Sequence, residues 1–150
     1  MSALRRRARI ARRCGIALFV SLLSGVAASP FALAQTISTF AGNGSNGFSG
    51  DGGPAVAASI YGTTGIVTDA AGNIYFSDAN NNRVRKVTPA GVITTIAGGG
   101  AGLGEGGPAT AAALHYPTGL TFDPSGNLYI AEPLFNRIRK VTPAGTISRR

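Results

Sequence analysis

Two groups of acidic and basic residues are the parts of this sequence best suited to chemistry. In each group one carboxylate stands five residues before the first of three cationic side chains, as in Asp78 followed by Arg83. The carboxylate ends one predicted strand and the arginine begins the next, so we expect the two to face each other across a hairpin. Such a structural pair contributes about 0.2–1 kcal/mol where it is exposed. The groups are Asp78, Arg83, Arg85 and Lys86, and then Glu132, Arg137, Arg139 and Lys140.

The residues that most often act in catalysis or bind metals are scarce. His115 is the only histidine, and the single cysteine, Cys14, lies near the N-terminus. A catalytic zinc site uses about three protein ligands, which one histidine does not supply. No serine or cysteine has a base in its sequence neighbourhood. The sequence therefore predicts no enzyme activity, no metal and no cofactor, and His115 is expected to be structural or to contribute to a binding loop.

Glycine-rich loops imitate two other kinds of site. GNGSNG, from Gly42, and GLGEGG, from Gly102, both fit the G-x-G-x-x-G pattern of dinucleotide-binding proteins. That pattern requires a real helix after the glycines, and both following segments break again within about ten residues. Asp51, in the segment FSGDGGPA just after the first of these loops, and Glu105, in the second, suggest calcium, but a hard cation needs about six oxygen ligands. We expect these two acids to shape the loops or to take part in surface binding.

The candidate residues recur because the chain repeats itself with a period of 54 residues. Aligning Gly52–Ile96 with Gly106–Arg150 gives 22 identical pairs in 45 positions. The shared segments are GGPA, T-G, G-N-x-Y and N-R-x-R-K-V-T-P-A-G. A fixed period of this size indicates a repeat architecture, in which one small unit is stacked or arrayed.

Each repeat is predicted to form four short antiparallel strands. In the first copy these are GIVTD, NIYFSD, RVRKV and VITTIAG, separated by the turns AAGN, ANNN and TPAG. A sheet unit of this length matches one blade of a β-propeller. A βαβ solenoid is disfavoured because the only helix-like piece, Pro54–Ile60, is about two turns long. The predicted fold is therefore all-β, with two four-stranded antiparallel propeller blades.

The run G-I-x-x-D-x-x-G-N-I-Y-x-x-D-x-x-N-N-R-V-R-K-V, from Gly65 to Val87, resembles an NHL repeat. The loop before it, GFSGDGGPAVAASIYGTTG, is similar to the inter-blade loop of secreted bacterial members, and the resemblance covers Ile37–Ser148. It implies part of a six-bladed propeller. ISTFAG matches ITTIAG, so it is expected to be a clasp strand of the kind that completes the last blade of a closed ring. The implied parts are a clasp strand (36–42), a loop (43–62), blade one (63–98), a loop (99–116) and an incomplete blade two (117–150).

The resemblance also gives the cationic residues a second interpretation. Some NHL propellers bind RNA or acidic protein segments, which would make these residues a basic rim recurring from blade to blade. No aromatic residues alternate with the cations, as single-stranded nucleic acid usually requires, so no nucleic-acid partner is predicted. The expected partner is a protein, a peptide or a cell-wall polymer. The residues of this rim are Arg83, Arg85, Lys86, Arg137, Arg139 and Lys140.

Residues 1–34 are predicted to be a Sec-type signal peptide. A block of arginines precedes the apolar run Gly15–Ala27, and an A-x-A site ends at Ala34. The apolar run is shorter than the roughly 20 residues of a membrane span. The protein is therefore expected to be secreted or periplasmic, with no membrane span after cleavage. Six basic residues leave with the leader, so the net charge falls to 8 − 6 = +2, and the only thiol leaves too.

The sequence thus predicts a binding or interaction scaffold without catalysis of its own. The alternative is a truncated propeller enzyme of the lyase or lactonase type, whose metal ligands would come from further blades. An incomplete reading frame is the third possibility. Six blades need about 320 residues, whereas Gln35–Arg150 supplies 150 − 34 = 116. We therefore expect bare blade faces, and a homo-oligomer that could complete the propeller.

Overall fold

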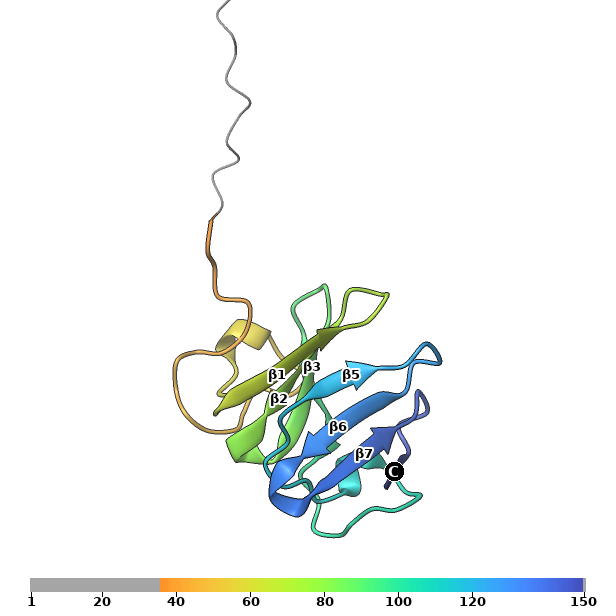
Figure 1. Ribbon diagram of the computed structural model, residues 1–150. Coiled ribbons are helices and arrows are strands. Elements are labelled where there is room, and N and C mark those ends of the chain that lie inside the picture. The colour runs from red at the N-terminus through yellow and green to blue at the C-terminus, as the bar shows by residue number, and fades with distance from the viewer. Residues whose placement is uncertain (1–35, 150) are drawn as a thin grey trace, which may run out of the picture. The chain divides into compact units, whose positions relative to one another are not determined.

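The computed structural model describes residues 36–149, which form two four-stranded antiparallel sheets (Figure 1). In each sheet the strands pair in chain order, from β1 to β4 and from β5 to β8. This arrangement confirms the all-β prediction of two propeller blades. The predicted leader lies outside the described residues. The strands are β1 (Thr63–Thr68), β2 (Ile74–Asp78), β3 (Arg83–Val87), β4 (Ile93–Gly98), β5 (Leu120–Phe122), β6 (Leu128–Glu132), β7 (Arg137–Val141) and β8 (Ile147–Arg149).

The helical structure in this part of the chain consists of four 3-10 turns. The piece expected to make about two helical turns over Pro54–Ile60 forms one short turn, because the chain is extended again from Ala58. No helix among the described residues is long and apolar enough to cross a membrane. The turns are η1 (Ala55–Ala57), η2 (Ala79–Asn81), η3 (Ala109–Ala111) and η4 (Pro133–Phe135).

The turn between the first two strands of each blade is organised by an aspartate. The Asp69 carboxylate accepts hydrogen bonds from Asn73 N (2.9 Å), Asn73 Nδ2 (2.7 Å) and Tyr75 Oη (3.0 Å). These bonds lower the pKa of Asp69, with the Asn73 side chain as the largest cause. Burial and this carboxylate raise the pKa of Tyr75 to about 12. Asp123 makes the same bonds in blade two, which explains why the chain repeats D-x-x-G-N-x-Y.

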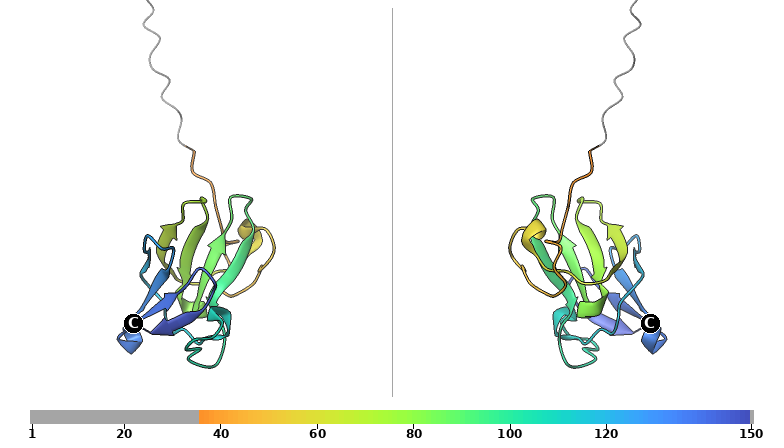
Figure 2. Two further views of the ribbon diagram at one scale, coloured as in Figure 1. Left: turned by 90° about the vertical axis from the view of Figure 1, so that its right-hand side faces the viewer. Right: turned by 90° about the vertical axis from the view of Figure 1, so that its left-hand side faces the viewer.

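The two blades pack face to face, as Figure 2 shows. Val84 and Ala97 of blade one are fully buried against an apolar cluster that includes Ile130 and Ile147 of blade two. The loop before β5 adds Leu114 to this core. Alternation along each strand produces the arrangement, because every second residue of β3 or β6 points to the same face.

Close contacts join β1 and β2 of blade one to the segment around β5 of blade two. Ser77 Oγ donates to the Thr118 carbonyl at 2.7 Å, and the Tyr75 and Phe122 rings meet edge to face with centroids 5.0 Å apart. A Cβ atom at Gly65 would collide with the Thr118 carbonyl oxygen. The glycine is therefore required by the approach of the two blades.

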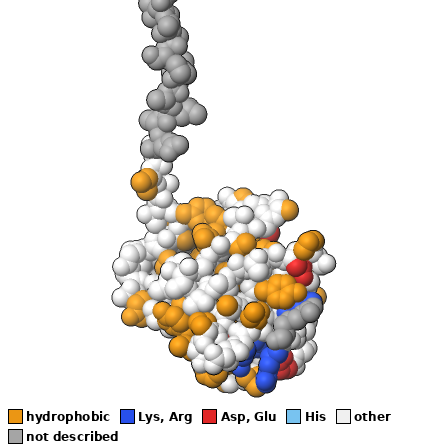
Figure 3. Space-filling view, in the orientation of Figure 1, with side chains coloured by type: hydrophobic (Ala, Val, Ile, Leu, Met, Phe, Trp, Pro, Cys, Tyr) orange, Lys and Arg blue, Asp and Glu red, His pale blue; other side chains and the backbone are white. Residues whose placement is uncertain are grey.

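The remaining face of each blade is covered to different degrees. The front face of blade one is the face that points away from blade two. There Phe76, Val87 and Ile93 pack against Ala55 and Ala58 of the preceding segment. The outer face of blade two is the face that points away from blade one. No sheet among residues 36–149 packs against it, and Ile138 on this face is 50% exposed. Figure 3 shows hydrophobic side chains open to solvent on one side of the molecule. Residues 36–42, predicted to be a clasp strand, form no strand, and no described strand pairs with them.

Candidate binding rim at the turn end of the blades

Turns η2 and η4 lie at the same end of the two sheets, and we call the surface around them the rim (Figure 1). The segments that lead into β1 and β5 meet the rim at Tyr61 and His115. Asn82 joins the blades here, because its Oδ1 accepts the Tyr116 N–H at 2.8 Å. The rim consists of Phe48, Tyr61, Asn82, Arg83, His115, Tyr116, Phe135 and Arg137.

In blade two the rim is built on the buried carboxylate of Glu132. Its Oε2 accepts from Arg137 Nε at 2.7 Å, and its Oε1 accepts from the His115 backbone N–H at 2.6 Å and from Arg137 Nη2 at 3.1 Å. The structure thus brings together the predicted hairpin pair Glu132 and Arg137. The bond to Glu132 also raises the pKa of Arg137, so this guanidinium is fixed in position and stays charged.

Blade one departs from the predicted pairing. Asp78 and Arg83 are opposite each other in the β2–β3 register, yet the Asp78 carboxylate binds Tyr61 N (2.7 Å), Asn81 Nδ2 (2.8 Å) and Arg85 Nη1 (3.3 Å). The expected Asp78–Arg83 ion pair is therefore wrong. Aspartate is one methylene shorter than the Glu132 of blade two, and its oxygens are already occupied. The Arg83 guanidinium lies instead over the Phe48 ring, 3.7 Å from its centroid.

The second arginine of each group is not on the rim. Arg85 and Arg139 are fully buried, because they point to the same face of their strands as the core residues opposite them, Phe76 and Ile130. Their assignment to a basic rim is therefore wrong. Burial lowers the pKa of Arg139, although nearby Glu105 opposes this shift.

The acids of the glycine-rich loops are the partners of these buried arginines. Asp51 Oδ1 lies 2.9 Å from Arg85 Nη2, and Glu105 Oε1 lies 3.3 Å from Arg139 Nη2. The same Nη2 atoms also donate to loop carbonyls, those of Ser49 and Leu103. Each loop is thereby fastened to its own blade.

The two lysines of the predicted basic rim point away from both the rim and the buried arginines. Lys86 and Lys140 alternate with the buried arginines, so they lie on the opposite faces of β3 and β7. Lys86 Nζ stands 5.7 Å from the centroid of the Tyr75 ring, which belongs to the blade interface. Of the cationic and histidine side chains predicted for binding, the rim holds Arg83, Arg137 and His115.

The aromatic residues of the rim escaped the sequence analysis. Phe48 stands 35 positions before Arg83, so no local sequence pattern predicts that these two side chains meet. Phe135 stacks on His115 with centroids 4.0 Å apart and lies 5.2 Å from the Arg137 guanidinium carbon. Phe135 stands only two positions before Arg137, so the sequence did offer this signal. The structure therefore interleaves aromatic rings with cations, contrary to the argument from spacing.

A metal site finds no support in the described part of the chain. No group of three or more His, Cys, Asp or Glu residues between positions 36 and 149 could hold a metal ion. His115 Nδ1 has one carboxylate near it, Glu132 Oε1 at 3.7 Å.

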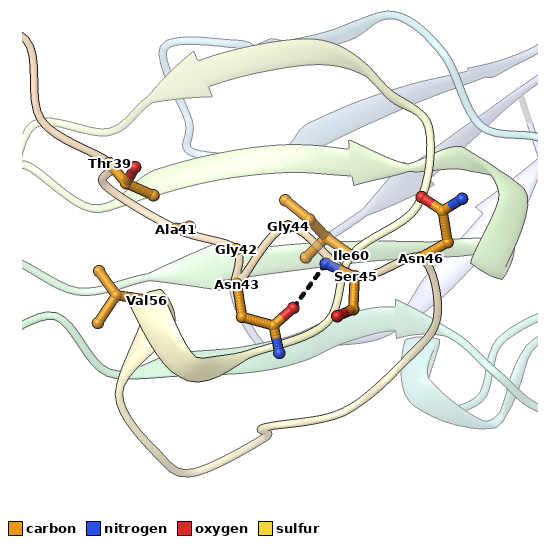
Figure 4. A pocket seen from close by; sticks show the side chains of 9 residues that line it. All are labelled: Thr39, Ala41, Gly42, Asn43, Gly44, Ser45, Asn46, Val56 and Ile60. Atoms are coloured by element: carbon orange, nitrogen blue, oxygen red, sulfur yellow. Dashed lines mark hydrogen bonds between the residues drawn. The ribbon is translucent and has the colours of Figure 1, made fainter.

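A second candidate site is an open pocket of about 670 Å³ beside the predicted clasp segment (Figure 4). Asn43 shapes its floor, because Asn43 Oδ1 accepts the Ser45 N–H at 2.9 Å. No charged or aromatic side chain lines this pocket, so the rim is the better equipped site. The lining residues are Thr39, Ala41, Gly42, Asn43, Gly44, Ser45, Asn46, Val56 and Ile60.

Comparison with solved structures agrees with the fold. An auxiliary nutrient binding protein from Bacteroides thetaiotaomicron matches with a TM-score of 0.56 and 25% identity, over 73% of this chain and 28% of that one. A protein from the same species, provisionally named a phosphatase, matches with a TM-score of 0.55 and 26% identity, over 73% and 26% of the two chains. These neighbours are propeller-type proteins. The two sheets are blades of a β-propeller.

The other comparisons add less. A virginiamycin B lyase from Staphylococcus aureus has a TM-score of 0.44 and 23% identity, over 59% of this chain and 26% of that one. No family model and no curated protein matches this chain. The chain spans about a quarter of the length of the solved structures that it matches.

Proposed function

We propose that this chain is an exported, NHL-type propeller segment that acts as a binding scaffold and has no catalysis of its own. The observation that carries the proposal is the unequal state of two equivalent arginines on the rim. Arg137 is held by Glu132, whereas Arg83 makes no ion pair with any acid between positions 36 and 149. Arg83 Nε is also buried without a hydrogen-bond acceptor. That buried atom is closed to a ligand, so a ligand carboxylate would bind the Nη atoms of this guanidinium instead.

The surroundings of Arg83 favour a ligand that combines carboxylates with apolar surface. The rings of Phe48, Tyr61 and Phe135 are 42%, 43% and 49% exposed. Exposed aromatic side chains supply contact area, and an arginine stacked on a ring keeps its donors aligned. An acidic segment of a protein or peptide, or a carboxylate-bearing wall polymer, has the matching chemistry. Loops and turns on a rigid sheet are also where recognition commonly lies.

The comparisons support binding in general terms. One of the proteins named above is a nutrient binding protein. The rim geometry is the main support for the proposal. Export through the predicted leader would place the rim outside the cytoplasm, where wall polymers and secreted proteins are its available partners.

The test is a calorimetric titration of the purified chain with a short polyglutamate peptide, repeated with Arg83→Ala. Loss of one charge-assisted hydrogen bond, about 1.5–3 kcal/mol, should weaken binding by about 10- to 150-fold. Lys86→Ala is the matched control, since it removes the same charge from the opposite face of β3. Wild-type affinity in the Arg83 variant, or an equal loss in the Lys86 variant, would contradict the proposal.

A further inference from the structure

The outer face of blade two is an apolar surface whose counterpart in blade one is buried. Ile138 is 50% exposed, while Val84, which stands 54 positions earlier, is fully buried at the blade interface. An apolar groove of about 260 Å³ runs beside Ile138. Its lining residues are Gly119, Leu120, Thr121, Tyr129, Ala131 and Ile138. This exposed face of blade two is therefore the repeat counterpart of the face of blade one that packs against blade two.

The front face of blade one carries the complementary exposure. Ile66 is 68% exposed, whereas Leu120, its counterpart in blade two, packs against the buried core. A second apolar groove of about 280 Å³ lies beside Ile66 and is lined also by Phe40, Ile60 and Phe76. Phe40 is itself 49% exposed. The front face of blade one is thus the repeat counterpart of the face of blade two that packs against blade one.

Among residues 36–149, the start of β7 in blade two lacks the strand partner that the start of β3 has in blade one. In blade one, β3 pairs at Arg83 and Val84 with Gly98 and Ala97 of β4. In blade two, the register between β7 and β8 covers Arg139 to Val141 and leaves Arg137 and Ile138 without a described partner on that edge.

The segment 40–42 is the repeat counterpart of residues 96–98. It lies on the front of blade one, where Gly42 N donates to the Ala55 carbonyl at 2.9 Å. No strand among residues 36–149 pairs with this segment. An unpaired segment of this kind is open to strand addition.

We propose that the outer face of blade two binds the front face of blade one in a second copy of this chain. Both halves of the contact are repeat counterparts of the interface that the chain already forms between its own blades. Segment 40–42 of one copy would lie along Arg137 and Ile138 of its neighbour, as residues 96–98 lie along β3. A contact between two different faces is heterologous, and it produces a ring when the rotation closes.

The test uses two variants that each block one face, Ile138→Glu on blade two and Ile66→Glu on blade one. Both side chains are exposed in the single chain, so neither change should disturb its fold, and circular dichroism checks this. Sedimentation velocity on the chain should show a species heavier than the monomer, whose share rises with protein concentration. Each variant alone should sediment as a monomer. Thr121→Glu is a second variant of the blade two face, and Ala90→Glu, in an exposed turn away from both grooves, is the control that should still associate.

Mixing the two variants gives the sharpest outcome. Each variant retains the face that the other has lost, so a head-to-tail contact predicts a one-to-one dimer and nothing larger. A wild-type chain that stays monomeric at every concentration would overturn the proposal. Association that persists in Ile138→Glu or Ile66→Glu alone would overturn it as well, as would a mixture that stays monomeric.

Discussion

Replacing Glu132 with glutamine removes the charge on which the blade two side of the rim is built. The carboxylate is fully buried, and it binds both the His115 backbone and the Arg137 guanidinium. The buried Arg139 lies 3.7 Å from the same carboxylate. Removing one partner of a buried ion pair costs about 3–5 kcal/mol, because the other charge is left uncompensated. That is a large part of the about 5–15 kcal/mol that stabilises an ordinary domain.

Urea unfolding followed by circular dichroism at a fixed protein concentration measures this loss. With a slope near 2 kcal/mol per molar urea, a loss of about 4 kcal/mol moves the midpoint down by about 2 M. Glu132→Asp is the matched control, because Asp78 shows that an aspartate at this position can bind the second arginine. It should lose less, and Arg137 should be released. A Glu132→Gln midpoint within experimental error of wild type would refute this account of the rim.

Three further predictions concern the blade interface, the turns and the lone histidine. Gly65→Ala should lower the free energy of unfolding by about 1–3 kcal/mol, because its Cβ would push against a backbone carbonyl of blade two. Gly119→Ala is the control, since its Cβ would have ordinary contacts and should have little effect on the single chain. Equal thermal melts for the two variants would contradict the prediction. The pKa values of Asp69 and Asp123 are lowered in the folded chain by hydrogen bonds from the asparagine of each turn, so their contribution is present above the unfolded value near pH 4 and is lost as the pH falls below it. The double variant Asp69→Asn/Asp123→Asn should therefore have a flatter stability profile below about pH 4, and an unchanged slope would count against the turn mechanism. His115→Ala should leave metal content unchanged by mass spectrometry, whereas stoichiometric zinc that disappears in the variant would contradict the absence of a metal role.

The strands and their order were predictable because the repeat states them twice. Alternating apolar residues define each strand, and the G-N-x-Y and T-P-A-G segments define the turns between them. The structure shows why these motifs recur: Asp69 and Tyr75 close one turn together, and Gly91 in another has a φ of 77°. Segment 36–42 was harder to assign, because a strand forms only beside a partner strand and no described strand pairs with this segment.

The site was less predictable, because the sequence does not show which charges a loop will cover. Arg83 and Arg85 point to the same face of β3 and belong to one basic run, yet the loop 43–62 brings the acid Asp51 to Arg85 and a ring, Phe48, to Arg83. Asp78 is one methylene shorter than Glu132, and Asn81 binds it where blade two has Phe135. Both differences leave the first arginine of blade one unpaired. Phe48 meets Arg83 only through the fold.

The central claim is that an acidic ligand binds on the rim through Arg83. Backbone amide chemical shifts of the isotope-labelled chain, recorded during titration with a short polyglutamate peptide, test it most directly. The account predicts perturbations confined to the rim, centred on Phe48, Asn82, Arg83 and Tyr116, which are lost in Arg83→Ala and retained in Lys86→Ala. Perturbations centred on the pocket beside Asn43, or no perturbation at saturating peptide, would contradict it.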